Sequence, residues 1–131
     1  MMQQQDEDAV FGPVIHSYSR AQALVDGYLI DASTLALEAG IGYPVAVTRG
    51  LWDRHIAVPQ RLTGLQDETG RLWDMLWMFR QAAGRGGRKI AFTVLFAEKR
   101  GRPPVQRQVT AVCGPDDDGE PVITLMLPDE D

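Results

Sequence analysis

The chain has 131 residues, of which 44% are hydrophobic and 24% are charged, and its formal net charge is −5. This length fits one domain, the composition is ordinary for a soluble globular protein, and no apolar run approaches the roughly 20 residues of a membrane-spanning helix. The acidic start of the chain (MMQQQDEDAV) is unlike a secretory signal peptide, and a single cysteine, Cys113, excludes an internal disulfide. We therefore expect a cytoplasmic protein without membrane association, in which Cys113 is a buried, unreactive thiol.

Helix caps organise the first half of the chain, after an acidic segment (residues 1–10) that we expect to be disordered. Ser19 can cap a short helix that Gly27 ends, and Ser33 and Gly40 frame a second helix in the same way. Thr48 is the expected cap of a third helix. The predicted helices cover 20–26, 34–39 and 49–55, and the predicted extended segments cover 14–15, 28–31 and 44–47.

The strongest helical pattern covers Thr69–Ala83 and follows a predicted loop at 57–68. At 100° per residue, Leu72, Leu76, Phe79 and Ala83 fall on one apolar stripe. The stripe is widened on one side by Met75, Met78 and Ala82, and on the other by Trp73 and Trp77. A helix that is apolar over so much of its surface must be covered on more than one side, so we expect it to lie at the centre of the core.

The final third of the chain changes from a helical period to the period of two that is typical of strands. Strands are predicted over 89–97, 105–113 and 122–127, separated by two polar turns. Both faces of the first strand are apolar, which favours a strand covered on both sides. The expected fold is a single α+β domain over residues 11–131, with short N-terminal helices and one long central helix packed on a three-stranded antiparallel meander.

Charge is segregated along the chain. Eight of the thirteen basic residues and one acidic residue lie between Arg80 and Arg107, a local charge of +7. Such a segment can steer a charged partner, and exposed tryptophan and arginine are enriched where proteins bind one another. The predicted partner-binding residues are Trp73, Trp77, Arg80, Arg85, Arg88, Arg100 and Arg102. Their alternative role is ordinary packing for the tryptophans and a solvated surface for the arginines.

Other motifs are weak. The glycine-rich basic segment 84–89 (GRGGRK) could contact phosphate, but its order of helix, loop and strand is the reverse of a phosphate-binding loop. The acidic turn 116–120 (DDDGE) is too short for a calcium loop. His16, Tyr18 and Arg20, with a later glutamate such as Glu98 or Glu120, could form an ADP-ribosyl-transfer-like site for a nucleotide or nicotinamide ligand. We predict no catalytic residues, no metal site and no cofactor.

Four strings resemble a bacterial family of small domains of unknown function carried on plasmids, phages and other mobile elements. They are FGPVIHSYSRAQALVDGYLIDAS, AGIGYPVAVTRGLWDR, DETGRLWDMLWM and AVCGPDDDGEPVITLMLPDED. The resemblance covers residues 11–131 and implies no catalytic residues. It implies a genetic context in which small accessory proteins bind host factors.

The leading functional hypothesis is therefore a non-enzymatic binding protein that modulates a host defence or replication factor by protein–protein contact. Alternative hypotheses are the enzyme site around Tyr18, nucleic-acid binding through the 85–107 segment, and self-association into a homodimer.

Overall fold

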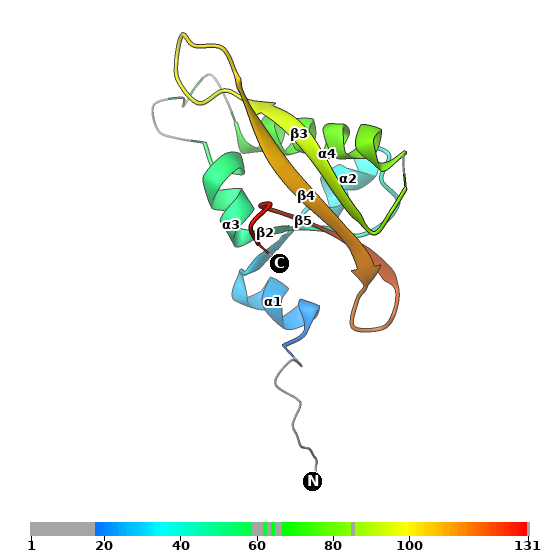
Figure 1. Ribbon diagram of the computed structural model, residues 1–131. Helices are drawn as coiled ribbons and strands as arrows, with labels where there is room; N and C mark the ends of the chain where they lie inside the picture. The colour runs from blue at the N-terminus through cyan, green and yellow to red at the C-terminus, as the bar shows by residue number, and fades with distance from the viewer. Residues whose placement is uncertain (1–17, 59–61, 63, 65–66, 85, 131) are drawn as a thin grey trace.

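A computed structural model describes residues 18–58, 62, 64, 67–84 and 86–130. The described chain is an α+β domain with one five-stranded sheet (Figure 1). The strands are β1 (Leu29–Asp31), β2 (Val45–Thr48), β3 (Lys89–Phe96), β4 (Val105–Pro115) and β5 (Pro121–Met126). The helices are α1 (Arg20–Asp26), α2 (Ser33–Glu38), α3 (Arg49–Leu51) and α4 (Glu68–Ala83), with a π-helical segment η2 (Trp52–Ile56) after α3. No helix among the described residues is both long enough and apolar enough to span a membrane.

The sheet corrects the predicted three-stranded meander. Its strand order is β1-β2-β5-β4-β3, and β2 pairs with β5 in parallel while every other pair is antiparallel. The expected antiparallel succession of β3, β4 and β5 is present, but it is only part of a mixed sheet. The prediction failed because β2 is four residues long, and three of them, Val45, Ala46 and Val47, are buried. A strand buried on both faces lacks the alternation that identifies a strand from sequence.

Local sequence signals for the helices are mostly confirmed. Ser19 Oγ accepts a hydrogen bond from the Gln22 amide at 3.0 Å, and Gly27 adopts the left-handed conformation (φ 83°) that ends α1. Thr48 Oγ1 likewise accepts from the Leu51 amide at 3.2 Å. Ser33 is an exception because it lies inside α2 and links Asp31 to the backbone of β2 instead. The predicted strand at 14–15 lies outside the described residues.

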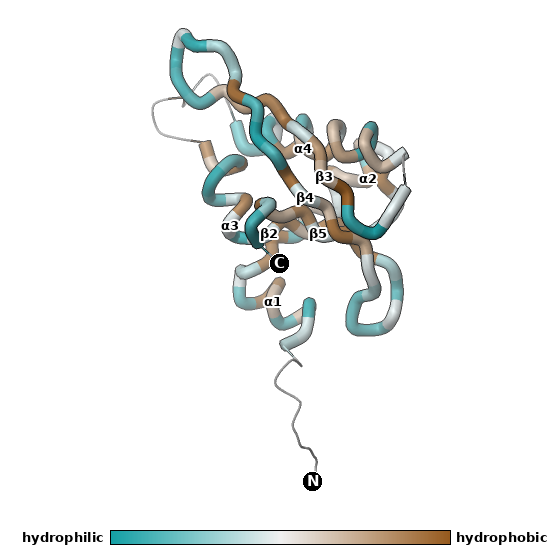
Figure 2. The backbone as a smooth tube through the Cα atoms, viewed as in Figure 1, coloured by the Kyte–Doolittle hydropathy of each residue, from teal (hydrophilic) through white to brown (hydrophobic). Residues whose placement is uncertain are grey.

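The core lies between α4 and one face of the sheet. Leu72, Met75, Leu76 and Phe79 are buried on α4, and the Phe79 ring lies 5.8 Å from that of Phe92 on β3. The hydrophobic colour of Figure 2 continues from α4 into the middle of the sheet, whereas the β3–β4 and β4–β5 turns are hydrophilic. The helix is therefore a principal core element, as predicted, but it is not the only cover of the sheet, because α2 packs against β2 and α3 against β5.

The β4–β5 turn holds α1 in place. Asp117 accepts hydrogen bonds from the backbone amides of Arg20 (3.0 Å) and Ala21 (3.1 Å), at the start of α1. The Arg20 guanidinium donates to Thr124 Oγ1 (2.6 Å) and to the carbonyl oxygen of Ile123 (3.0 Å) on β5. These four bonds connect segments about a hundred residues apart in the sequence.

Candidate partner-binding surface

The outer edge of β3 is a free edge of the sheet. The amide of Cys113 donates to the carbonyl oxygen of Arg88 at 2.7 Å, and this pair lies in register with Lys89 opposite Val112. Because backbone groups alternate in direction along an antiparallel strand, even-numbered residues of β3 bond to β4 and odd-numbered residues point outward. No described strand pairs with that side of β3. The amide and carbonyl groups of Ala91, Thr93 and Leu95 are therefore available to an added strand.

Apolar side chains flank this edge on both faces of the sheet. Trp77 (42% exposed) and Met78 (41%) project from α4, and Leu95 (55%) projects from the opposite face of β3. These side chains line a hollow of about 410 Å³ together with Thr93 and Gln106. Large apolar side chains gathered in this way beside an open edge are typical of a protein-binding surface.

Three predicted residues are held in a fixed arrangement beside this surface. The rings of Trp73 and Trp77 stack with centroids 6.3 Å apart at an angle of 13°, and the Arg80 guanidinium lies 5.6 Å from the Trp77 ring. Trp73 is half-buried against the core, so it supports the ring of Trp77 from behind. Gly40 leaves room for Arg80, because a Cβ at Gly40 would lie only 2.7 Å from Arg80 Nε.

The basic residues do not form one patch. Arg88 precedes β3, whereas Arg100 and Arg102 lie in the turn that follows it, at the other end of the strand. At about 3.3 Å per residue the two ends of β3 are roughly 25 Å apart. Arg107 is bound by Glu98, with contacts of 2.7 and 2.6 Å. The structure thus brings together Trp73, Trp77 and Arg80 but separates Arg88 from the turn, and Arg85 lies outside the described residues.

The described side chains of the predicted enzyme site form hydrogen bonds or ion pairs within the fold. The Tyr18 hydroxyl donates to Asp26 at 2.6 Å, and this carboxylate raises the pKa of Tyr18 to about 12. Arg20 holds α1 to β5, and Glu98 is bound to Arg107, while His16 lies outside the described residues. In the acidic turn, Asp116 accepts from the backbone amides of Asp118 and Glu120, so these acids organise the turn.

Sequence reasoning missed two members of the surface. Met78 was assigned to the buried stripe, but it lies beyond the part of α4 that the sheet covers. Leu95 belongs to the apolar second face of β3, which we expected to be covered; that expectation is wrong at this position, because α4 packs on the other face and Leu95 is 55% exposed. The sequence offered one signal for this surface, which is a strand with two apolar faces followed by a polar turn.

The fold defines a class, a small α+β domain with a mixed five-stranded sheet and an open apolar edge. The chain belongs to a family of unknown function (DUF6573), whose model matches residues 9–131. No curated protein and no solved structure matches the chain.

Proposed function

We propose that the chain is a non-enzymatic binding protein that receives an extended segment of a partner protein on the outer edge of β3. The observation that carries the proposal is that Trp77 lines the same hollow as Thr93 and Leu95, whose backbone groups face outward. Addition of a strand to an open edge is a recurrent mode of peptide recognition, in which backbone hydrogen bonds give affinity and side-chain pockets give specificity.

The shape of the edge specifies the chemistry of the partner. The hollow has Trp77 and Met78 on the α4 face and Leu95 on the opposite face, so both faces of the incoming strand meet apolar side chains. A segment that carries apolar or aromatic residues near its centre, without proline, fits this edge. Trp77 is the expected main contributor to affinity, since tryptophan is enriched among residues that dominate binding energy.

The partner that we propose is a host defence or replication factor. This choice depends on the mobile-element context that the resemblance implies, and that context is itself part of the proposal. We expect electrostatic attraction to contribute less to partner binding than the sequence suggested, because the arginines are distributed over both ends of β3.

Selection from a displayed random-peptide library, followed by amide hydrogen exchange, tests the proposal directly. Selected peptides should slow exchange at Ala91, Thr93 and Leu95. Thr93→Pro removes only an outward-facing amide, so it should leave the sheet intact and weaken binding at least tenfold. Leu95→Lys should also weaken binding, whereas its matched control Leu37→Lys, at a position 68% exposed on α2, should not.

Two outcomes would overturn the proposal. One is a selected peptide whose binding is unaffected by both Thr93→Pro and Leu95→Lys. The other is a wild-type chain that forms a dimer at micromolar concentration by light scattering and becomes monomeric on Thr93→Pro, because the edge is then occupied by a second copy.

A further inference from the structure

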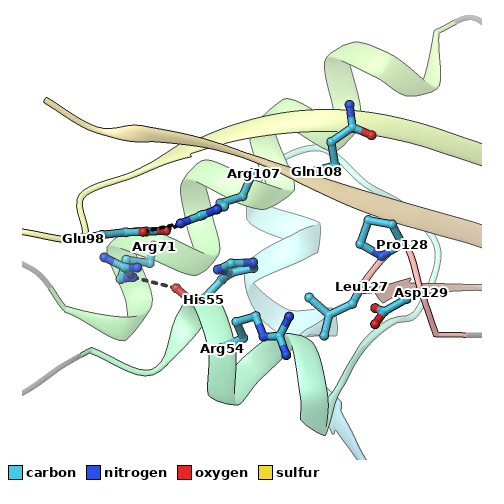
Figure 3. A pocket seen from close by; sticks show the side chains of 9 residues that line it. All are labelled: Arg54, His55, Arg71, Glu98, Arg107, Gln108, Leu127, Pro128 and Asp129. Atoms are coloured by element: carbon cyan, nitrogen blue, oxygen red, sulfur yellow. Dashed lines mark hydrogen bonds and ion pairs between the residues drawn. The ribbon is translucent and has the colours of Figure 1, made fainter.

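A polar cleft of about 580 Å³ lies beside the first turns of α4 and is separate from the β3 edge (Figure 3). Its side chains come from η2, α4, β4 and the segments that follow β3 and β5. Figure 3 shows His55 and Arg54 extending toward the same space, with Leu127 beyond them, while Arg107 reaches toward Glu98. The volume lies within the range of small-molecule sites, roughly 300–1,000 Å³.

His55 is the unusual member of this cleft. The residue is only 6% exposed, and its Nδ1 atom is buried without a hydrogen-bond partner in the described part of the chain. The ring stacks on Phe96 with centroids 5.2 Å apart at an angle of 11°, which fixes its orientation. A buried polar atom without a partner costs about 1–3 kcal/mol and is rare in folded proteins. The Nδ1 atom itself is not exposed to the cleft, so another part of the imidazole ring lines it.

The backbone that carries His55 is also unusual. Residues 52–56 form a π-helical turn, in which the Ala57 amide donates to the Trp52 carbonyl oxygen at 2.8 Å. Single π-helical turns are frequent at functional sites because they redirect the side chains that they carry. Here the turn directs both Arg54 and His55 toward the cleft.

The charges around the cleft are prearranged for an anion. Arg54, Arg71 and Arg107 line it, against Glu98 and Asp129, which leaves a surplus of one positive charge when His55 is neutral. Arg107 is oriented by its two contacts with Glu98, and Arg54 has no ion pair with any described residue. Arginine is well suited to carboxylate and phosphate groups because its planar donors match their oxygens.

We propose that this cleft binds a small organic anion, with its carboxylate or phosphate group against Arg54 and Arg107 and a hydrogen-bonding group on the His55 imidazole. This site is independent of the partner-binding edge. The ligand compensates the charge of Arg54, which has no ion pair with a described residue.

Protonation of His55 should couple to binding. Burial lowers the pKa of His55, so the free protein carries a neutral imidazole at neutral pH. The charged groups that face it are Glu98, Arg107, Arg54 and Arg71, and Asp129 lines the same cleft. A bound anion opposes the three arginines and favours the imidazolium form. For a ligand whose own charge stays constant, affinity should therefore increase as the pH falls toward the lowered pKa of His55.

The test is calorimetric titration with citrate, inorganic phosphate and a short single-stranded DNA, at constant ionic strength set with sodium chloride. We expect citrate or phosphate to bind to the wild-type chain, and Arg54→Gln and His55→Gln each to weaken binding at least tenfold. Arg88→Gln, an exposed arginine elsewhere on the chain, should change affinity less than twofold.

The variant Arg54→Gln decides the test if His55→Gln fails to fold, because Arg54 is exposed. The proposal is overturned if neither small anion binds more tightly than chloride. It is equally overturned if Arg54→Gln binds like the wild type, or if only the DNA binds.

Discussion

The Nε–H group of Arg71 donates a 2.7 Å hydrogen bond to the carbonyl oxygen of His55, in the π-helical turn. Its Nη1 donates to the carbonyl oxygen of Ala97 at 2.8 Å, directly after β3. Arg71 is only 3% exposed and its guanidinium lies 5.1 Å from the Phe96 ring. One buried arginine therefore joins α4, η2 and the end of β3.

We predict that Arg71→Met lowers the free energy of unfolding by about 2–4 kcal/mol, because two buried carbonyl groups lose their donor. Arg71→Lys should recover only part of the loss, since one ammonium group cannot reproduce the planar pair of donors. Urea denaturation measures both, with Arg88→Met as an exposed control expected within about 0.5 kcal/mol of wild type. Equal stability of Arg71→Met and the control would contradict the assigned role.

The stability of the domain should depend on pH through His55. Burial lowers the folded-state pKa of His55 below its unfolded value of about 6.5, so the unfolded chain binds more protons in the interval between them. The contribution of the neutral His55 to the free energy of unfolding is therefore fully present above pH 6.5, and it decreases as the pH falls through that interval. Urea midpoints at pH 7.5 and 5.5 measure the effect. His55→Phe should reduce the difference between the two midpoints, and His16→Gln should not.

Asp117 provides a capping interaction from a distant part of the sequence. Asp117→Ala removes the acceptor of two amides at the start of α1, and we expect a loss of about 1–2 kcal/mol in unfolding free energy. The matched control is Asp118→Ala, the exposed neighbouring acid, which should change stability by less than about 0.5 kcal/mol. If the two variants are equally stable, the turn does not hold α1.

Gly40 and Gly42 offer a direct comparison for the packing of Arg80. Gly40 has φ +90°, and an added Cβ would lie 2.7 Å from Arg80 Nε, whereas a Cβ at Gly42 meets nothing within 4 Å. We expect Gly40→Ala to destabilise the chain by about 1–2 kcal/mol through backbone strain and to change tryptophan fluorescence by moving Arg80 away from Trp77. Gly42→Ala should do neither.

The positions of helices could be predicted from this sequence much better than the way in which the strands pair. Caps such as Ser19 and the periodicity of residues 69–83 locate helices because they depend on neighbours within a few positions. The parallel pairing of β2 with β5 depends on residues almost eighty positions apart, and the pattern Val45–Val47 contains no information on its partner strand. Trp77 and Arg80 could be grouped from the sequence because they lie one helical turn apart, and the structure places them side by side; their role in binding a partner stays a prediction.

The polar cleft could not have been predicted, because its residues come from five separate segments. The segment 49–55 that carries His55 was expected to be an ordinary helix, and neither the π-helical turn nor the buried Nδ1 has a sequence signature. No role was predicted for Arg71. Its burial becomes understandable only when the ends of η2 and β3 supply carbonyl acceptors for its guanidinium.

The strand order β1-β2-β5-β4-β3 places the last strand of the chain, β5, inside the sheet. Without β5, the β1–β2 pair and the β3–β4 pair would not be joined by strand pairing. β5 follows all of these strands in the chain, and its insertion between β2 and β4 joins them. A chain in which β5 is not yet paired would leave the edges of β2 and β4 that face β5 without a strand partner. The inner edges of β2 and β4 are the surfaces on which a chaperone, or a misfolded neighbour, would act.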